Sequence, residues 1–145
     1  MSERLDLALG LDVDAYIEGL FVPHDGHLAQ ALDDAQKAGL PAINVSANEG
    51  KLLHLIARIA GARRILEVGT LGGYSTAWLA RAVPADGHVI TLEIDPRHAE
   101  VARKNLARCG PFQGLIRVQG PFVGEHDIDP HRRRRRGDGW GARPS

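Results

Sequence analysis

The sequence predicts an α/β fold built on a parallel sheet. Three observations predict it: short apolar or β-branched runs, helical segments that alternate with them, and glycine-rich turns where a run gives way to a helix. Strands that alternate with helices at these lengths form right-handed β-α-β units, whose strands run parallel. The chain has 145 residues, which suffices for one such domain and leaves no room for a second.

Two helices are expected near the N-terminus. Asp12 can cap a helix over residues 12–21, where apolar residues recur at a spacing of three or four. A second helix is expected from about 26 to 37, because its apolar residues are spaced in the same way and Gly39 follows as a stop. The apolar stripe of the first helix needs a surface to cover.

A capping box marks the start of a third helix. The Ser46 hydroxyl can accept the backbone N–H of Glu49, whose carboxylate can accept the N–H of Ser46. Leucines and isoleucines give this helix a broad apolar face, and Gly61 supplies a left-handed stop.

From residue 64 onward, strand and helix alternate. The first run, at 65–68, is too short for a helix and is bounded by glycines, as expected of a buried parallel strand. The expected elements are a strand at 65–68, a helix at 74–82 closed by a turn at 84–87, a strand at 88–94, a helix that begins at Pro96 after its cap Asp95 and ends at Gly110, and a strand at 115–118.

Composition limits the functions that the chain can have. With Cys109 as the only cysteine, an internal disulfide is excluded. No apolar stretch is long enough to span a membrane, and the N-terminus lacks the plan of an export signal, so we expect a cytoplasmic domain without a membrane partner. The net charge is zero although five arginines stand together at 132–136, so the rest of the chain is acidic by the same amount. We therefore expect no nucleic-acid partner.

The character of the chain changes after Gly120. Glycines and prolines surround the arginine run, and no apolar period remains. We expect residues 1–120 to form the folded domain and residues 121–145 to be a basic, disordered tail. The segment 125–131 contains five aspartate, glutamate and histidine side chains, but it lacks a scaffold that would fix a coordination geometry, and we expect no metal site there.

The candidate ligand site lies at 67–73, where the first strand turns into its helix with the sequence EVGTLGG. Open α/β sheets bind nucleotides at this place. Glu93 ends the next strand about twenty residues further on, at the position of the carboxylate that accepts hydrogen bonds from ribose hydroxyls. An NAD site and an S-adenosylmethionine site both need such an acid.

Glu67 favours S-adenosylmethionine over NAD. A carboxylate at the mouth of the glycine turn would repel a pyrophosphate, whereas it suits the ammonium of a methionine moiety and the field of a sulfonium. The glycines also read G-x-x-G-G, which is not the G-x-G-x-x-G spacing of dinucleotide sites. An alternative remains in which Glu67 is a solvated strand end and the glycines form only a tight turn.

Three segments together resemble one family. LPAINVS at 40–46, ILEVGTLGGYST at 65–76 and TLEIDP at 91–96 are similar to the cation-dependent O-methyltransferases related to catechol and caffeoyl-CoA methyltransferases. The resemblance covers about residues 12–120. It implies a Rossmann-like class I methyltransferase fold, present here in part as the N-terminal helices and the first three parallel strands.

The resemblance also implies a reaction and a set of residues that bind the methyl donor. The expected reaction is methyl transfer to the hydroxyl of a small aromatic acceptor, with a divalent cation such as Mg²⁺ holding the hydroxyl. A homodimer is expected as well. Val45 would contact S-adenosylmethionine through its backbone, Glu67 and Ser75 would hold its methionine end, Gly69 and Leu71 would line the turn, Glu93 would bind the ribose, and Ile94 would flank the adenine.

The sequence departs from the family pattern after the third expected strand. The family's metal ligands lie in a segment of the kind FIDADK and a later DN, and neither occurs here, so the sequence identifies no metal ligand and no catalytic residue. We expect a truncated or frameshifted product whose first strand has an open edge. The alternatives are a non-catalytic module that binds S-adenosylmethionine and an NAD-binding half of a dehydrogenase.

Overall fold

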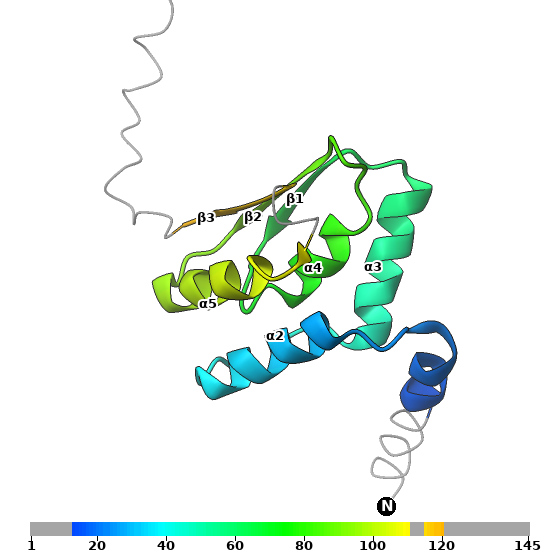
Figure 1. Cartoon of the computed structure of the whole chain (residues 1–145), viewed down its shortest axis with the longest axis horizontal. Coiled ribbons are helices and arrows are strands. Elements are labelled where there is room, and N and C mark those ends of the chain that lie inside the picture. Colours follow the sequence, from blue (N-terminus) through cyan, green and yellow to red (C-terminus); the bar gives the residue numbers. More distant parts are fainter. Residues whose placement is uncertain (1–12, 111–114, 121–145) are drawn as a thin grey trace, which may run out of the picture.

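The structure, a computed structural model, describes residues 13–110 and 115–120 (Figure 1). Strand and helix alternate after three N-terminal helices, as the sequence predicts. The elements are a helix at residues 13–21, α2 (Gly26–Lys37), α3 (Ala47–Ile59), β1 (Arg64–Val68), α4 (Tyr74–Ala80), β2 (His88–Leu92), α5 (Pro96–Leu106) and β3 (Ile116–Gln119).

The three strands form a parallel sheet in the order β1-β2-β3. Val68 at the end of β1 pairs with Leu92 at the end of β2, which in turn pairs with Gln119 of β3. The carboxyl ends of all three strands therefore meet at one edge of the sheet, and the glycine turn and Glu93 both follow directly at that edge. Among the described strands, β1 has one unpaired edge, as expected.

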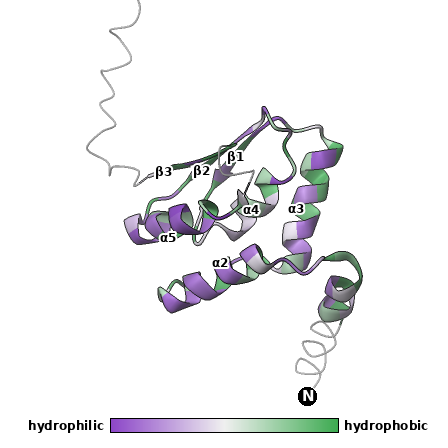
Figure 2. Ribbon diagram, viewed as in Figure 1, coloured by the Kyte–Doolittle hydropathy of each residue, from purple (hydrophilic) through white to green (hydrophobic). Residues whose placement is uncertain are grey.

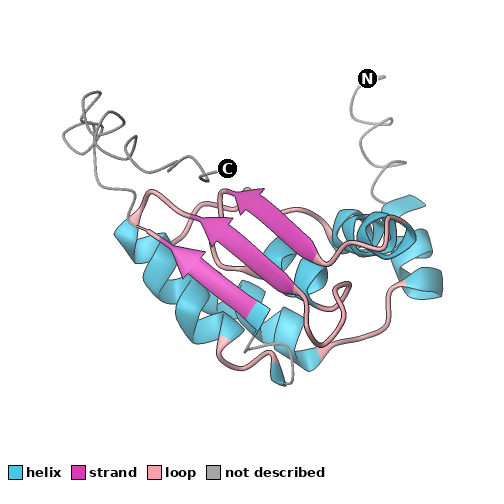
Figure 3. Cartoon of the chain, turned by 90° about the horizontal axis from the view of Figure 1, so that it is seen from above, coloured by secondary structure: helices cyan, strands magenta, loops and turns pink. Residues whose placement is uncertain are grey.

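Helices cover one face of the sheet. Figure 3 looks onto the bare face, with α4 and α5 behind the strands. Helix α2 packs on α4 and α5, while α3 packs beside α4. The main core cluster lies among these helices and consists of Leu28, Tyr74, Ala77, Trp78, Ala102, Leu106 and Cys109.

Side-chain caps fix where the helices begin. The capping box at Ser46 and Glu49 is confirmed, with both of its hydrogen bonds present. Asp95 accepts the N–H of Arg97 and caps α5, also as predicted. Asp25 caps α2 by accepting two backbone N–H groups, a cap that the sequence analysis did not identify.

The prediction that the first strand is buried is wrong for one of its faces. Ile65 and Glu67 are half-buried toward the helices, but Leu66 is 66% exposed and Val68 is 81% exposed on the opposite face. The reason is that α4 and α5 both lie on the same side of the sheet, so no described element covers the other side.

The apolar stripes of two helices are also exposed. Figure 2 shows hydrophobic residues on the helix at 13–21 and along α3, in contrast to the largely hydrophilic α5. The exposed side chains are Val13, Tyr16, Ile17, Leu20 and Phe21 on the first helix, and Leu52, Leu55, Ile56 and Ile59 on α3. The buried side of α3 instead presents Gly50 and Ala57 to the core. None of the helices in the described part of the chain has the length and apolarity needed to cross a membrane.

Candidate functional site

A cavity of about 850 Å³ opens at the carboxyl edge of the sheet. Its walls come from one face of α2, the loop at 40–45, the glycine turn with the start of α4, and the segment at 93–98 after β2. Cavities of this size hold small-molecule ligands, and open α/β sheets bind their ligands at this edge. The cavity is therefore the candidate ligand site of the described chain.

The glycine turn presents its backbone to this cavity. Gly69 has a φ of 91°, and an added Cβ would meet nothing within 4 Å, so a ligand can approach the backbone closely. A Cβ on Gly72 would stand 2.9 Å from the Cβ of Ala35, so α2 leaves no room for a side chain there. Leu71 has a φ of 50°, a left-handed conformation that costs a non-glycine residue roughly 1–2 kcal/mol. Contacts from neighbouring elements must therefore hold the turn in this shape.

Glu93 supplies one such set of contacts. Its Oε2 accepts the N–H groups of Thr70 at 3.1 Å and Leu71 at 2.8 Å. Its Oε1 accepts the N–H groups of Ile94 at 2.8 Å and Asp95 at 2.9 Å. Burial alone would raise the pKa of Glu93, which is only 6% exposed, but the four N–H groups outweigh this effect and hold the pKa below its ordinary value. The ionised carboxylate thus ties the glycine turn to the end of β2.

Glu67 lies behind the cavity wall and does not line it. Its side chain is half-buried between β1 and the start of α4, where Oε1 accepts the hydroxyl of Ser75 at 2.6 Å and Oε2 accepts the hydroxyl of Thr76. Ser75 itself lines the cavity. Because Ser75 donates its hydrogen to Glu67, its oxygen keeps lone pairs that can accept a hydrogen bond from a ligand. The negative charge of Glu67 therefore acts on the cavity through Ser75.

The structure brings together most of the residues that the sequence analysis assigned to the methyl donor. Six of the seven line the cavity, namely Val45, Gly69, Leu71, Ser75, Glu93 and Ile94. Glu67 does not line the cavity and reaches its wall through the hydroxyl of Ser75, which donates a hydrogen bond to it.

Other residues of the wall were missed. Asp95 and His98 line the cavity beside Glu93, with His98 Nδ1 3.8 Å from Glu93 Oε1 and His98 Nε2 3.8 Å from Asp95 Oδ2. The signal that could have identified His98 is its place one turn after the cap of α5, which directs it toward the strand end. The apolar wall from α2 gave no such signal, since Ala31 and Ala35 look like ordinary core positions.

Three other histidines lie outside the cavity wall. His24 and His27 are exposed. His54 is partly buried on α3, with Nδ1 3.3 Å from the carbonyl oxygen of Trp78, and burial lowers its pKa. The indole of Trp78 packs in the core.

The described residues do not form a cation site. Within 13–110 and 115–120, no three histidine, cysteine, aspartate or glutamate side chains come together in a way that could hold a metal ion. The segment 125–131 lies outside the described residues. The cavity wall contains the carboxylates of Glu93 and Asp95, which accept the backbone N–H groups of the glycine turn and of the start of α5, and this donor set does not fit a divalent cation.

Comparison with known proteins identifies a matching family model. Residues 22–120 match the model described as O-methyltransferase. The chain is similar to a catechol O-methyltransferase of Niastella koreensis, with 53% identity over 98 residues, which are 68% of this chain and 44% of that relative. It is also 52% identical over 112 residues to a catechol O-methyltransferase of Mycobacterium tuberculosis, covering 77% of this chain and 51% of the relative. The chain thus spans about half the length of the curated relatives that it matches.

Solved structures show the same fold. The O-methyltransferase from Bacillus cereus in complex with SAH superposes with a TM-score of 0.71 at 44% identity, over 74% of this chain and 49% of that chain. The O-methyltransferase TomG from Streptomyces achromogenes, in complex with SAM, gives a TM-score of 0.69 at 47% identity, over 74% and 48% of the two chains. The partial Rossmann-like fold with three parallel strands is therefore confirmed.

Proposed function

Because the chain belongs to the O-methyltransferase family, we propose that its cavity binds S-adenosylmethionine and serves methyl transfer to the hydroxyl of a small aromatic acceptor. One observation carries the donor assignment. The buried, ionised Glu93 stands at the carboxyl edge of the sheet, beside an open glycine turn, where a ribose would be held. The names of the two catechol O-methyltransferases support an aromatic acceptor.

The chemistry of the walls fits the parts of the methyl donor. The oxygen of Ser75, with the charge of Glu67 behind it, suits the ammonium of the methionine moiety. Val45 and Gly69 also line the cavity, and an added Cβ on Gly69 would meet nothing within 4 Å, so the turn is open to a ligand. Ile94 is 75% exposed beside Glu93 and offers an apolar surface to a purine ring.

The residues of this chain contribute positioning. S-adenosylmethionine supplies the reactive methyl carbon when it is bound. Glu93, Ser75 and the glycine turn would orient that carbon toward an acceptor, which is a large part of what any methyl-transfer catalyst does. No step is assigned to a metal ion, because the described residues do not fit one.

Isothermal titration calorimetry of the full chain with S-adenosylhomocysteine and with NAD tests the donor assignment. We expect S-adenosylhomocysteine to bind with a Kd above about 1 µM, which corresponds to a binding free energy smaller in magnitude than about 8 kcal/mol. NAD should give no heat of binding. Binding of NAD in preference to S-adenosylhomocysteine would overturn the proposal. If neither compound binds, the proposal is overturned as well.

A non-catalytic module that binds the same donor is the second candidate. It is favoured by the lack of a cation site among the described residues. A radiolabelled methyl-transfer assay with catechol and Mg²⁺ separates the two candidates. Methyl transfer by the chain supports the enzyme, whereas donor binding without transfer supports the module.

We also propose that copies of the chain pair through the helix at 13–21. Its five large apolar side chains are exposed in the single chain, and an apolar stripe of this size is typical of a surface that a partner covers. Sedimentation equilibrium at several concentrations tests this proposal, since a monomer at every concentration would contradict it.

A further inference from the structure

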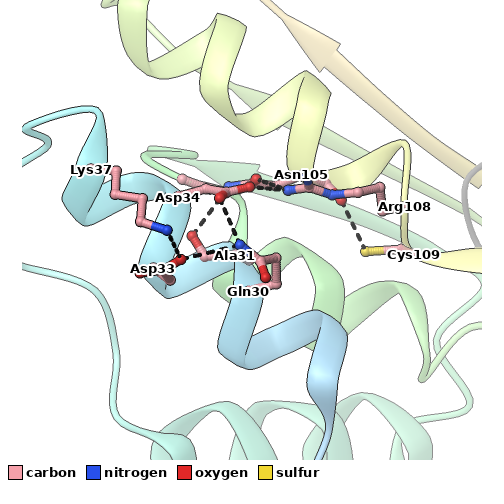
Figure 4. Close-up of polar contacts among 9 residues, drawn as sticks. Gln30, Ala31, Asp33, Asp34, Lys37, Asn105, Arg108 and Cys109 are labelled. Carbon is pink, nitrogen blue, oxygen red and sulfur yellow. Dashed lines mark hydrogen bonds and ion pairs between the residues drawn. The ribbon is translucent and has the colours of Figure 1, made fainter.

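Asn105 on α5 contacts three separate parts of the fold (Figure 4). Its Nδ2 group donates to the carbonyl oxygen of Gly72 at 2.9 Å and to that of Ala31 at 3.2 Å. Its Oδ1 accepts a hydrogen bond from the guanidinium of Arg108 at 2.7 Å. The side chain is 4% exposed, so water does not compete for these bonds.

This contact completes a pair of anchors on the glycine turn. Glu93 accepts the N–H of Leu71 from the side of β2, and Asn105 donates to the carbonyl of Gly72 from the side of α5. The left-handed Leu71 lies between the two anchors. Loss of either anchor would allow the peptide that joins Leu71 to Gly72 to rotate toward an ordinary conformation.

Asn105 also sets the distance between α2 and the turn. Ala31 and Gly72 both line the cavity, and the same amide group holds both of their carbonyls. Because a Cβ on Gly72 would stand 2.9 Å from the Cβ of Ala35, α2 is in close contact with the turn at this point. The width of the cavity between α2 and the turn therefore depends on one buried amide.

Arg108 forms the solvent-exposed end of the hydrogen-bond network around Asn105. Arg108, whose side chain is 48% exposed, forms an ion pair with Asp34 of α2 in addition to its bond to Asn105. An exposed ion pair of this sort contributes little to stability and touches no wall of the cavity. It offers a control in which the same network is broken without loss of the amide donors.

From these contacts we propose that Asn105 is a positioning residue for methyl-donor binding, holding the turn and α2 in the shape that the donor requires. The inference rests on the proposed donor site. It predicts that Asn105 affects donor affinity beyond any effect on folding, although it does not itself line the cavity.

The test compares Asn105→Asp with Arg108→Gln in the full chain. Asn105→Asp keeps the size of the side chain but replaces the NH₂ group, which donates to both carbonyls, by one carboxylate oxygen that cannot donate to them. We expect the Kd for S-adenosylhomocysteine, measured by calorimetry at a temperature where each protein is fully folded, to rise about tenfold or more. Arg108→Gln should leave the Kd within about twofold of the unchanged chain.

A folded Asn105→Asp variant with an unchanged Kd would overturn the inference and leave the donor site standing. Absence of binding by the unchanged chain would overturn both. If Asn105→Asp does not fold, the unchanged chain decides by NMR: the side-chain amide signals of Asn105 should shift during a titration with S-adenosylhomocysteine, together with the backbone signal of Leu71. Signals of Asn105 that stay fixed, like those of the exposed amide of Gln30, would overturn the inference.

Discussion

Burial raises the pKa of the Glu93 carboxyl, whereas hydrogen bonds from backbone N–H groups lower it. Four backbone N–H groups donate hydrogen bonds to its two oxygens. The side-chain amide of a glutamine has one oxygen, so it could accept only those N–H groups that face that oxygen. Glu93→Gln would place an NH₂ group against two N–H donors, so we expect a loss of about 2–4 kcal/mol in the free energy of unfolding by urea. The control is Glu100→Gln on the exposed face of α5, where loss of the ion pair with Lys104 should change the free energy of unfolding little, because solvent screens the pair. Similar losses for the two variants would contradict the role given to Glu93.

The lowered pKa of Glu93 predicts how stability depends on pH. Since the folded-state pKa lies below the ordinary value of 4.5, the ionised carboxylate contributes stability above that pH. The contribution is lost as the pH falls through the folded-state pKa, because the unfolded chain takes up the proton first. The difference in unfolding free energy between the unchanged chain and Glu93→Gln should therefore be constant at pH values well above the ordinary pKa and should narrow as the pH falls below it. A difference that stays constant throughout would contradict this prediction.

Leu71 provides a test of backbone strain in the turn. Its positive φ favours glycine, so Leu71→Gly should be more stable than Leu71→Ala by about 1 kcal/mol in urea unfolding. At Leu79 in α4 the order should reverse, because alanine is favoured over glycine in a helix by about 1 kcal/mol. If Leu71→Ala were at least as stable as Leu71→Gly, as expected at Leu79, Leu71 would not be strained.

At the scale of single residues, the sequence predicted most of the polar residues that line the cavity and not the contacts that support them. Ser75 and Glu93 could be placed there because they follow a glycine turn and a strand end, whereas Glu67 was expected at the cavity and lies behind its wall. The contact of Glu67 with Ser75 is eight residues apart in the chain and depends on how α4 docks on β1. Asn105 could not be found, since an asparagine on a helix is ordinarily exposed and its partners are 33 and 74 residues away.

At the scale of the helices, the close contact between α3 and α4 depends on Gly50, which has no side chain. A Cβ on Gly50 would clash with Cδ1 of the Trp78 indole. Gly50→Ala should therefore lower the free energy of unfolding by about 1–3 kcal/mol, even though alanine favours a helix. Gly26→Ala at the start of α2, where an added Cβ meets nothing within 4 Å, should leave stability unchanged or raise it by up to about 1 kcal/mol. Thermal unfolding followed by circular dichroism measures both, and a stable Gly50→Ala variant would contradict the packing.

Element boundaries were predicted well where a local signal sets them. The capping box at Ser46, the cap at Asp95 and the glycines after the helices act over a few residues, so the sequence alone contains the information. Burial was predicted less well. An apolar residue such as Val68 records a preference for burial, but what buries it depends on elements that lie elsewhere in the fold.

For the molecule as a whole, the bare face of the sheet predicts self-association. Leu66 and Val68 form part of an exposed apolar surface that favours contact with other apolar surfaces. The double variant Leu66→Lys and Val68→Thr should lower the sedimentation coefficient at high concentration and change the unfolding free energy by less than about 0.5 kcal/mol. Ile65→Thr, on the covered face of β1, should lower stability without reducing association. If the double variant associates like the unchanged chain, the bare face is not the contact surface.

The strand order has a consequence for how the chain acquires its site during synthesis. Spatial order equals chain order, so each strand leaving the ribosome can add to the edge that its predecessor has just formed. The nascent glycine turn remains without its carboxylate until residue 93 has emerged and β2 has docked, because Glu93 supplies the acceptors for Thr70 and Leu71. Because Asn105 of α5 is the second anchor of this turn, recognition of a ligand should arise abruptly in a growing polypeptide, at the length where both β2 and α5 have cleared the exit tunnel, and not gradually along it.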